Sequence, residues 1–339
     1  MFGNSLMHSV LPENRTSRGL NTSGDAVMKW DLPTLLQPVQ GRKRFHQPLA
    51  RYSSFRIGGP ADALVLVEDI ENLKTLQAIA REHDIPLFIL GGGSNLLIRD
   101  GGIRGIVIAM RGTFRTYQVE PCTDEPANGC PGAEVQAGVG CSLSRLAMQL
   151  AQQSWSGLEF AYGIPGTLGG AMIMNAGTHL GDLSQVLISA RVLLPHGRVD
   201  VIPSRDLGLR YRGSSYPAAS IILGATLQVW RGDRDTIEST MRESNERRQR
   251  TQPLWLPNAG SIFKNPPGTA AARLIDELGL KGTRMGGAMI SPVHANFLVN
   301  VDRAKATDVE ALIQLIRTRV YEAYGIELEP EVRIVGEEG

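Results

Sequence analysis

The chain has 339 residues, with 35 Lys or Arg, 34 Asp or Glu and 42% hydrophobic residues. This length predicts two or three domains, and the composition is that of a packed globular protein, which excludes a disordered chain. A net charge of +1 argues against a partner bound through its phosphate backbone, so we expect no nucleic acid.

The cysteines and histidines show no metal-binding pattern. Cys122, Cys130 and Cys141 form no CxxC pair, and the six histidines form no HxxxH pair, so we expect neither a metal site nor a disulfide framework. The sequence also lacks a signal-peptide pattern and any stretch approaching 18 apolar residues, which argues against secretion and against a membrane span. These observations predict a cytoplasmic protein that does not bind a membrane.

Residues 1–40 are polar and show no sustained periodicity, which predicts a poorly ordered N-terminal extension. An α/β unit is expected at 41–110, where Asp69 can cap a helix whose apolar residues share one face. Short apolar runs in this unit are typical of buried strands. The predicted strands are 63–67, 86–90 and 105–110.

A second, β-rich unit is expected at 111–232. It has a strand from Glu134, a helix capped by Ser142, a hairpin around Pro195–Arg198 and a long strand at 220–230. Because the composition becomes helical and basic after Gly232, we place a third unit at 233–339.

The third unit shows recognisable helix ends. A helix at 270–278 is expected to end at Gly279, and a second helix is expected to begin with a Thr307–Glu310 capping box and to close at Gly325. The predicted helical and basic stretch is 236–250, and the predicted strands are 296–301 and 331–335.

Two glycine-rich segments, at 91–95 and 163–170, are candidate phosphate-binding loops. Glycine allows several backbone N–H groups to converge on one anion, because no Cβ blocks the approach. A Rossmann fingerprint places its glycines between the first strand and a helix, whereas the first segment here follows the second predicted strand. A nicotinamide-type Rossmann domain is therefore disfavoured. Taken alone, the two segments are equally consistent with tight turns that bind nothing.

Six segments carry a more specific pattern. They are SFRIGGPAD (54–62), GGGSNLL (91–97), GIPGTLGGAMIMNAG (163–177), YRGS (211–214), NAGSIFKNP (258–266) and LEPEVRIVG (328–336). In this order, over residues 53–336, they resemble the UDP-N-acetylenolpyruvoylglucosamine reductase (MurB) family, whose members are flavin-dependent enzymes of peptidoglycan synthesis. The compact interval between Arg212 and Ser261 resembles the shorter form of the family, which lacks an extra loop with a substrate-covering tyrosine.

The resemblance implies an α+β protein. Residues 41–110 and 111–232 would form the two subdomains of an FAD-binding fold of the vanillyl-alcohol-oxidase (PCMH) type, and 233–339 a C-terminal α/β substrate-binding domain. It further implies a UDP-N-acetylmuramate dehydrogenase, which holds FAD non-covalently and takes electrons from NADPH. The small-molecule substrate would be UDP-N-acetylglucosamine enolpyruvate, and the protein would be a monomer or weak dimer.

The first three segments contain the residues that the resemblance assigns to FAD. These are Ser54, Arg56, Gly58, Gly59, Gly91, Gly92, Gly93, Ser94, Asn95, Leu96, Gly163, Ile164, Pro165, Gly166, Gly169, Gly170, Asn175, Ala176 and Gly177.

The resemblance implies three catalytic residues, with Ser261 as the proton donor and Arg212 and Glu331 as stabilisers of the substrate carboxylate. From spacing alone, Ser261 is a turn serine and Arg212 an ordinary surface arginine. The family pattern selects Glu331 over Glu329 because Glu331 directly precedes Val-Arg.

The implied substrate-binding residues include polar groups that would support the site, such as His294 and Asn296. Charge alone does not choose among Arg242, Arg247, Arg248 and Arg250, which would ordinarily form a solvated helix face. The substrate-binding set is Tyr211, Arg212, Arg248, Lys264, Asn265, His294 and Asn296.

Two other functions stay open at this level. A flavin oxidase or dehydrogenase of the same fold, acting on an alcohol or hydroxy acid, would share the glycine loops but would not need NAGSIFKNP together with LEPEVR. A nucleotide-binding regulatory domain would share the loops but would contain no flavin.

Overall fold

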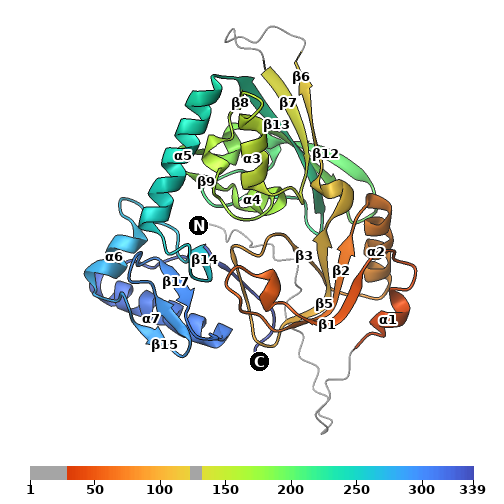
Figure 1. Ribbon diagram of the computed structural model, residues 1–339. Coiled ribbons are helices and arrows are strands. Elements are labelled where there is room, and N and C mark those ends of the chain that lie inside the picture. The colour runs from red at the N-terminus through yellow and green to blue at the C-terminus, as the bar shows by residue number, and fades with distance from the viewer. Residues whose placement is uncertain (1–28, 123–131) are drawn as a thin grey trace, which may run out of the picture.

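The computed structural model describes residues 29–122 and 132–339 (Figure 1). Its first sheet has the strand order β1–β2–β5–β3, in which β1 is antiparallel and the other three strands are parallel. Both faces of β5 are covered, which explains the unbroken apolar run in the sequence. The strands are β1 (Lys43–Pro48), β2 (Pro60–Val67), β3 (Leu87–Leu90) and β5 (Ile103–Met110).

Helix α2 (Ile70–Glu82) crosses from β2 to β3 and packs on one face of this sheet. The Asp69 side chain caps the helix by accepting a hydrogen bond from the Asn72 N–H at 2.8 Å, as the sequence predicts. Two of its own side chains, Leu73 and Leu76, are fully buried in the core that the helix shares with the sheet. The opposite face of the sheet packs with Leu49 and Ile98 in a separate apolar cluster.

The second sheet has the strand order β12–β11–β13–β7–β6, with β8 paired to the end of β13, and all its pairs are antiparallel. The predicted hairpin is confirmed in β11 and β12. Helices α3 and α4 belong to the same large core as this sheet and α2. The elements are β6 (Tyr117–Pro121), β7 (Gly132–Gly138), α3 (Leu143–Ala151), β8 (Trp155–Ser156), α4 (Leu168–Met174), β11 (Leu187–Leu193), β12 (Val199–Pro203) and β13 (Ile221–Arg231).

Helix α5 (Arg234–Thr251) leads from the second sheet to the C-terminal part (Figure 1). There a sheet of order β14–β17–β16–β15 packs with α6 and α7 around its own core. Gly325, with φ +66°, ends α7 in the left-handed conformation, as predicted. The elements are β14 (Asn258–Ser261), α6 (Ala271–Glu277), β15 (Arg284–Met285), β16 (Ala288–Ile290), β17 (Phe297–Asn300) and α7 (Ala306–Tyr324).

The chain end returns to the first unit, because β18 (Arg333–Val335) pairs in parallel with β4 (Leu96–Ile98). This pairing joins the C-terminal part to the segment that contains the first glycine loop. The remaining elements are α1 (Leu32–Leu35), β9 (Gly177–Thr178), β10 (Gly181–Asp182) and short 3₁₀ turns at Ala50–Tyr52, Gly112–Arg115, Glu159–Ala161, Leu183–Gln185 and Ser204–Asp206.

The predicted α+β class is confirmed, but two local predictions are wrong. Residues 32–39 do not belong to a poorly ordered extension, because Leu32, Leu36 and Val39 are buried in the large core; residues 1–28 lie outside the described part. The expected capping box at Thr307 is also wrong. The N-cap of α7 is Lys305, two residues before Thr307. The Asp308 carboxylate accepts from the Lys305 N–H at 2.9 Å, and the Asp100 carboxylate accepts from the Ala306 N–H at 3.0 Å.

The burial of the α1 segment leads to a stability prediction. Leu36→Ala should lower the free energy of unfolding by about 2–5 kcal/mol, because it removes a fully buried side chain from the core. The neighbouring Gln37→Ala is the control, since Gln37 is exposed and its change should stay within about 0.5 kcal/mol. Denaturant unfolding of both variants measures the difference. Equal stability would show that this segment does not contribute to the core.

Candidate active site

The two glycine loops, at 91–95 and 163–170, lie directly against each other. A Cβ on Gly92 would come within 2.6 Å of the Gly166 Cα, and a Cβ on Gly93 within 2.0 Å of the Tyr52 carbonyl oxygen. The Ser94 hydroxyl donates a hydrogen bond to the Pro165 carbonyl at 2.9 Å. Glycine is therefore required at 92 by the contact between the loops, and at 93 by the contact with the Tyr52 backbone.

The first glycine loop also presents free backbone donors. Among the residues that the structure describes, the N–H groups of Gly92, Gly93, Ser94 and Asn95 find no hydrogen-bond acceptor. Successive free amides in a turn are suited to the oxygens of a phosphate. The loop therefore fits a diphosphate such as the one in FAD.

The segment at 54–59 is hydrogen-bonded to the first glycine loop. The Ser54 N–H donates to the Gly93 carbonyl at 3.1 Å, and the Ser54 hydroxyl donates to the Asn258 carbonyl at 2.6 Å. Ser54 therefore links the first loop to β14 of the C-terminal part. Gly59 lies against the turn after β4, where a Cβ would come within 2.1 Å of the Asp100 carbonyl oxygen.

Arg212 and Glu331 form a partly buried ion pair. The Arg212 Nε donates to the Glu331 Oε1 at 2.9 Å, with side-chain exposures of 21% and 17%. A second guanidinium nitrogen, Nη2, donates to the Gly177 carbonyl at 3.1 Å. The backbone of Arg212 adopts a left-handed conformation, with φ +53°. Arg212 therefore has a strained backbone within a turn, and its side chain is not that of an ordinary surface arginine.

Burial raises the pKa of the Glu331 carboxyl above its ordinary value, although the charges of Arg212 and Lys264 lower it. Desolvation is the dominant cause of this shift. Glu329, the alternative glutamate, instead pairs with Lys264 and its side chain is 59% exposed. Of the two candidates, only Glu331 lies beside Arg212.

Ser261 ends β14, and Ile262, the residue after it, is hydrogen-bonded to the backbone of Glu331. The Ile262 carbonyl accepts the Glu331 N–H at 2.7 Å, and the Ile262 N–H donates to the Asn296 carbonyl at 2.9 Å. The buried Asn296 side chain also bonds to both the N–H and the carbonyl of Phe263. The segment that follows Ser261 is therefore fixed on both sides.

The other predicted substrate residues take different positions. His294 accepts the Asn296 N–H through Nδ1 at 3.3 Å, and burial lowers the pKa of its imidazole. The Asn265 side chain accepts the Ala271 N–H at the start of α6. Tyr211 is 53% exposed, and its ring lies 5.0 Å from the Arg212 guanidinium.

The structure separates the four arginines of α5. Arg242, Arg247 and Arg250 are exposed, whereas Arg248 is half-buried. The guanidinium of Arg248 lies against the second glycine loop, where a Cβ on Gly163 would be 3.0 Å from Nη1. Burial lowers the pKa of this group.

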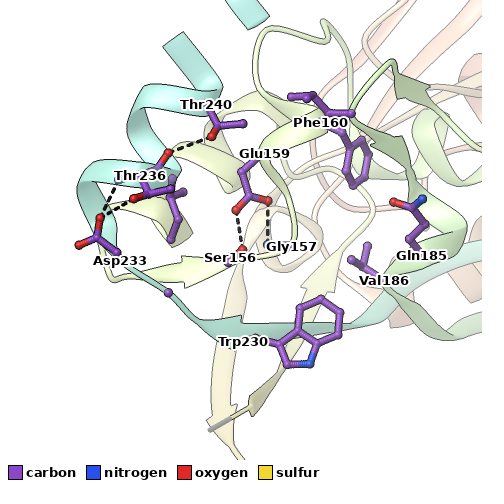
Figure 2. Close-up of a pocket in the computed structure, with 13 residues that line it drawn as sticks. Ser156, Gly157, Glu159, Phe160, Gln185, Val186, Trp230, Asp233, Thr236 and Thr240 are labelled. Carbon is purple, nitrogen blue, oxygen red and sulfur yellow. Dashed lines mark hydrogen bonds between the residues drawn. The ribbon is translucent and has the colours of Figure 1, made fainter. Parts of the chain in front are cut away.

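The pocket drawn in Figure 2 is not built from these residues. It has a volume of about 560 Å³ and lies between β8, the end of β13 and the start of α5. Trp230 and Phe160 line it, and the Glu159 carboxylate within it already accepts from the Ser156 hydroxyl and the Gly157 N–H.

Within residues 29–122 and 132–339, we find no group of three His, Cys, Asp or Glu side chains that could hold a metal ion. In the same ranges, every helix is too short or too polar to span a membrane.

Comparison with known proteins decides the family. The C-terminal domain of UDP-N-acetylenolpyruvoylglucosamine reductase matches residues 252–335, and an FAD-binding domain family matches residues 61–202. A UDP-N-acetylenolpyruvoylglucosamine reductase of Symbiobacterium thermophilum is 44% identical over 297 residues, which are 87% of this chain and 93% of the relative. The chain belongs to the UDP-N-acetylenolpyruvoylglucosamine reductase family.

Two further similarities agree with this assignment. The corresponding reductase of Alkaliphilus oremlandii is 44% identical over 86% of this chain and 93% of its own length. The crystal structure of the reductase (MurB) from Thermus caldophilus matches with a TM-score of 0.72 and 36% identity, covering 87% of this chain and 98% of that one. The predicted resemblance and the FAD-binding fold with a C-terminal domain are therefore confirmed, and FAD is the cofactor.

Some residues of this site were not among those predicted. Thr167 caps α4 within the second glycine loop, and its hydroxyl lies 2.7 Å from where a Cβ on Gly91 would be. A threonine before an apolar helical run is a recognisable N-cap signal. The Asn258 carbonyl, at the start of β14, accepts a hydrogen bond from the Ser54 hydroxyl. No local sequence signal reveals a contact between residues so far apart in the chain.

The contact between the two loops predicts a specific loss of cofactor affinity. Gly92→Ala should weaken FAD binding about 10- to 100-fold, because overpacking of this kind costs about 1–3 kcal/mol. Gly197→Ala is the control, since a Cβ there meets nothing within 4 Å and the strain of its left-handed backbone, with φ +86°, falls in the turn between β11 and β12, outside the two glycine loops. Titration of the apoprotein with FAD measures both affinities. An unchanged affinity in Gly92→Ala would contradict a role for the loop contact in FAD binding.

Proposed function

We propose that the chain catalyses the NADPH-dependent, FAD-mediated reduction of UDP-N-acetylglucosamine enolpyruvate to UDP-N-acetylmuramate, a step of peptidoglycan biosynthesis. The observation that supports it most is the Arg212–Glu331 pair at 2.9 Å, together with the backbone hydrogen bond from Glu331 to Ile262, the residue that follows Ser261. The working form would be a cytoplasmic monomer or weak dimer that acts on this small nucleotide.

The first and second glycine loops are the proposed FAD cradle. The free amides of Gly92, Gly93, Ser94 and Asn95 would donate to the diphosphate. When bound, FAD supplies a hydride from N5 to the vinyl carbon of the substrate. The set carried over from the family pattern, from Ser54 to Gly177, belongs to this proposal apart from Asn175, whose buried amide is hydrogen-bonded within the protein.

Arg212 and Glu331 would stabilise the charge that develops on the substrate carboxylate. Addition of hydride to the vinyl carbon moves an electron pair toward this carboxylate and gives an aci-anion. The fixed guanidinium of Arg212 would stabilise it electrostatically, and a protonated Glu331 would donate a hydrogen bond. A preorganised donor of this kind is typically worth about 2.7–4 kcal/mol.

Ser261 would complete the reaction by giving its hydroxyl proton to the adjacent carbon. A serine hydroxyl is a weak acid, but a carbanion-like centre is a strong base, so the transfer is feasible. Lys264, Asn265 and Arg248 would hold the nucleotide, with Tyr211 beside Arg212. His294 and Asn296 would support the strand that carries Ser261, through the bonds of Asn296 to Phe263.

A substitution of Ser261 separates catalysis from a structural role. Ser261→Ala should lower turnover by about 10²- to 10⁴-fold, the range of general acid steps, and leave flavin reduction by NADPH near normal. Ser261→Cys should recover part of the activity, because a thiol can also deliver a proton. Steady-state assays and stopped-flow spectroscopy at the flavin band measure the two effects. Near-normal reduction of the enolpyruvyl nucleotide by Ser261→Ala would move the donor role elsewhere, with Glu331 as the next candidate.

The Arg212–Glu331 pair should act only in the second half-reaction. Arg212→Ala should slow flavin reoxidation by the substrate about 10²- to 10³-fold, and Glu331→Gln should also slow it, while both variants keep normal reduction by NADPH. Stopped-flow measurement of each half-reaction tests this. Equal slowing of both halves would refute the assignment.

The pH dependence follows from the raised pKa of Glu331. If the protonated form is active, the rate of reoxidation should stay high above the pH at which an ordinary glutamate ionises, and then fall as the pH rises through this pKa. In Glu331→Gln this alkaline fall should disappear. Rate constants measured across the pH range would contradict the proposal if the variant kept the same fall.

A further inference from the structure

A buried asparagine connects the two segments that hold Arg212. We infer that Asn175 is a positioning residue, which fixes both the turn that carries Arg212 and the hairpin that receives its guanidinium. This inference rests on the proposed function, because it assumes that Arg212 acts on the substrate.

The side chain of Asn175 is oriented by its backbone. It follows α4 in the left-handed conformation, with φ +41°, and it is 2% exposed. Asparagine tolerates this conformation better than most residues. The chain turns sharply there, and the amide points toward two segments that are distant in sequence.

The amide nitrogen holds the turn of Arg212. Asn175 Nδ2 donates to the Arg210 carbonyl at 3.2 Å. The same carbonyl accepts the Gly213 N–H at 3.1 Å, and the Arg210 N–H donates back to the Gly213 carbonyl at 3.0 Å. Arg212 lies inside this closed turn, so a shift of the Arg210 carbonyl would move its backbone.

The amide oxygen holds the partner of the guanidinium. Asn175 Oδ1 accepts the Ser184 N–H at 2.9 Å, a donor that it shares with the Asp182 carboxylate. Asp182 ends β10, and β10 pairs with β9, whose Gly177 carbonyl accepts from Arg212. One buried amide is therefore hydrogen-bonded both to the turn that carries Arg212 and to the segment that follows the hairpin accepting its guanidinium.

This arrangement gives Asn175 a different role from the flavin contact that the family resemblance implies. Its oxygen and one of its two N–H bonds are already used within the protein, and little of the side chain is accessible to a ligand. The loss of this buried amide removes one hydrogen bond from the Arg210 carbonyl and one from the Ser184 N–H. The Arg210 turn and the β9–β10 hairpin would then lose the link that Asn175 provides between them.

The main test is Asn175→Gly, which removes the amide but allows the left-handed backbone. Flavin reoxidation by the enolpyruvyl nucleotide should slow about 10²-fold, as expected when a reacting group is misplaced by about 1 Å. FAD affinity and flavin reduction by NADPH should not change. Asn175→Asp retains the acceptor and loses the donor, so it should change the same rate in the same direction, and it serves if Asn175→Gly does not fold.

A pH profile distinguishes positioning from a general loss of structure. The charged groups that act on Glu331 are Arg212 and Lys264, and both lower the pKa of its carboxyl. If Arg212 moves away in the Asn175 variants, this pKa should rise, and the alkaline fall of the reoxidation rate should shift to higher pH. A merely destabilised protein would keep the wild-type profile.

Asn72→Ala is the matched control. Its amide also bridges two segments, because Oδ1 accepts the Gln40 N–H at 2.8 Å and Nδ2 donates to the Asp69 carboxylate at 2.7 Å. This bridge does not involve Arg212, so the reoxidation rate and its pH profile should equal those of the wild type.

The outcomes separate the inference from the proposed function. Loss of FAD binding in the Asn175 variants would make Asn175 a flavin contact and overturn the inference. Normal reoxidation in these variants, with slow reoxidation in Arg212→Ala, would overturn the inference alone. Normal reoxidation in Arg212→Ala as well would overturn the proposed role of Arg212.

Discussion

The pairing of β18 with β4 is the constraint on which the site depends. It brings the end of the chain beside the first glycine loop, where Asn95 Nδ2 donates to the Glu331 carbonyl and the Arg333 N–H donates to the Asn95 carbonyl. Asn95 therefore belongs to the proposed FAD cradle through its backbone and to the Glu331 segment through its side chain. A movement of either segment would be transmitted to the other by these two hydrogen bonds.

The Arg212–Glu331 pair shows why such a firm framework is needed. A carboxyl that is mostly withdrawn from water favours its neutral form, whereas an adjacent guanidinium favours the charged form. The protonation state of Glu331 thus depends on how closely Arg212 approaches it. Because the two residues come from distant segments, this distance is set by the turn at 210–213, the β9–β10 hairpin and the β18–β4 pairing together.

The sequence predicts the regular elements well and the long-range contacts poorly. Asp69 and Gly325 act as local signals: α2 begins after Asp69 and α7 ends at Gly325, as expected. The α1 segment was not predicted because the helical spacing of Leu32, Leu36 and Val39 extends over only about two turns and is interrupted by two prolines. Thr307 was favoured as a cap because Asp100 is distant in sequence. In the site, the family pattern supplied Arg212 and Glu331. It could not reveal that Arg248, rather than its exposed neighbours, lies against Gly163.

Glycine is needed for different physical reasons at different positions of the two loops, although the sequence motif does not distinguish these positions. Gly92 and Gly93 are required by neighbouring backbone, because a Cβ would overlap Gly166 and Tyr52, whereas a Cβ on Gly170 would meet only the Thr167 hydroxyl at 3.8 Å. The close contacts hold the free amides of the first loop in place without a ligand. A cradle that is already ordered loses less conformational entropy when it binds. Close packing of the two loops and affinity for the flavin diphosphate are therefore consequences of the same missing side chains.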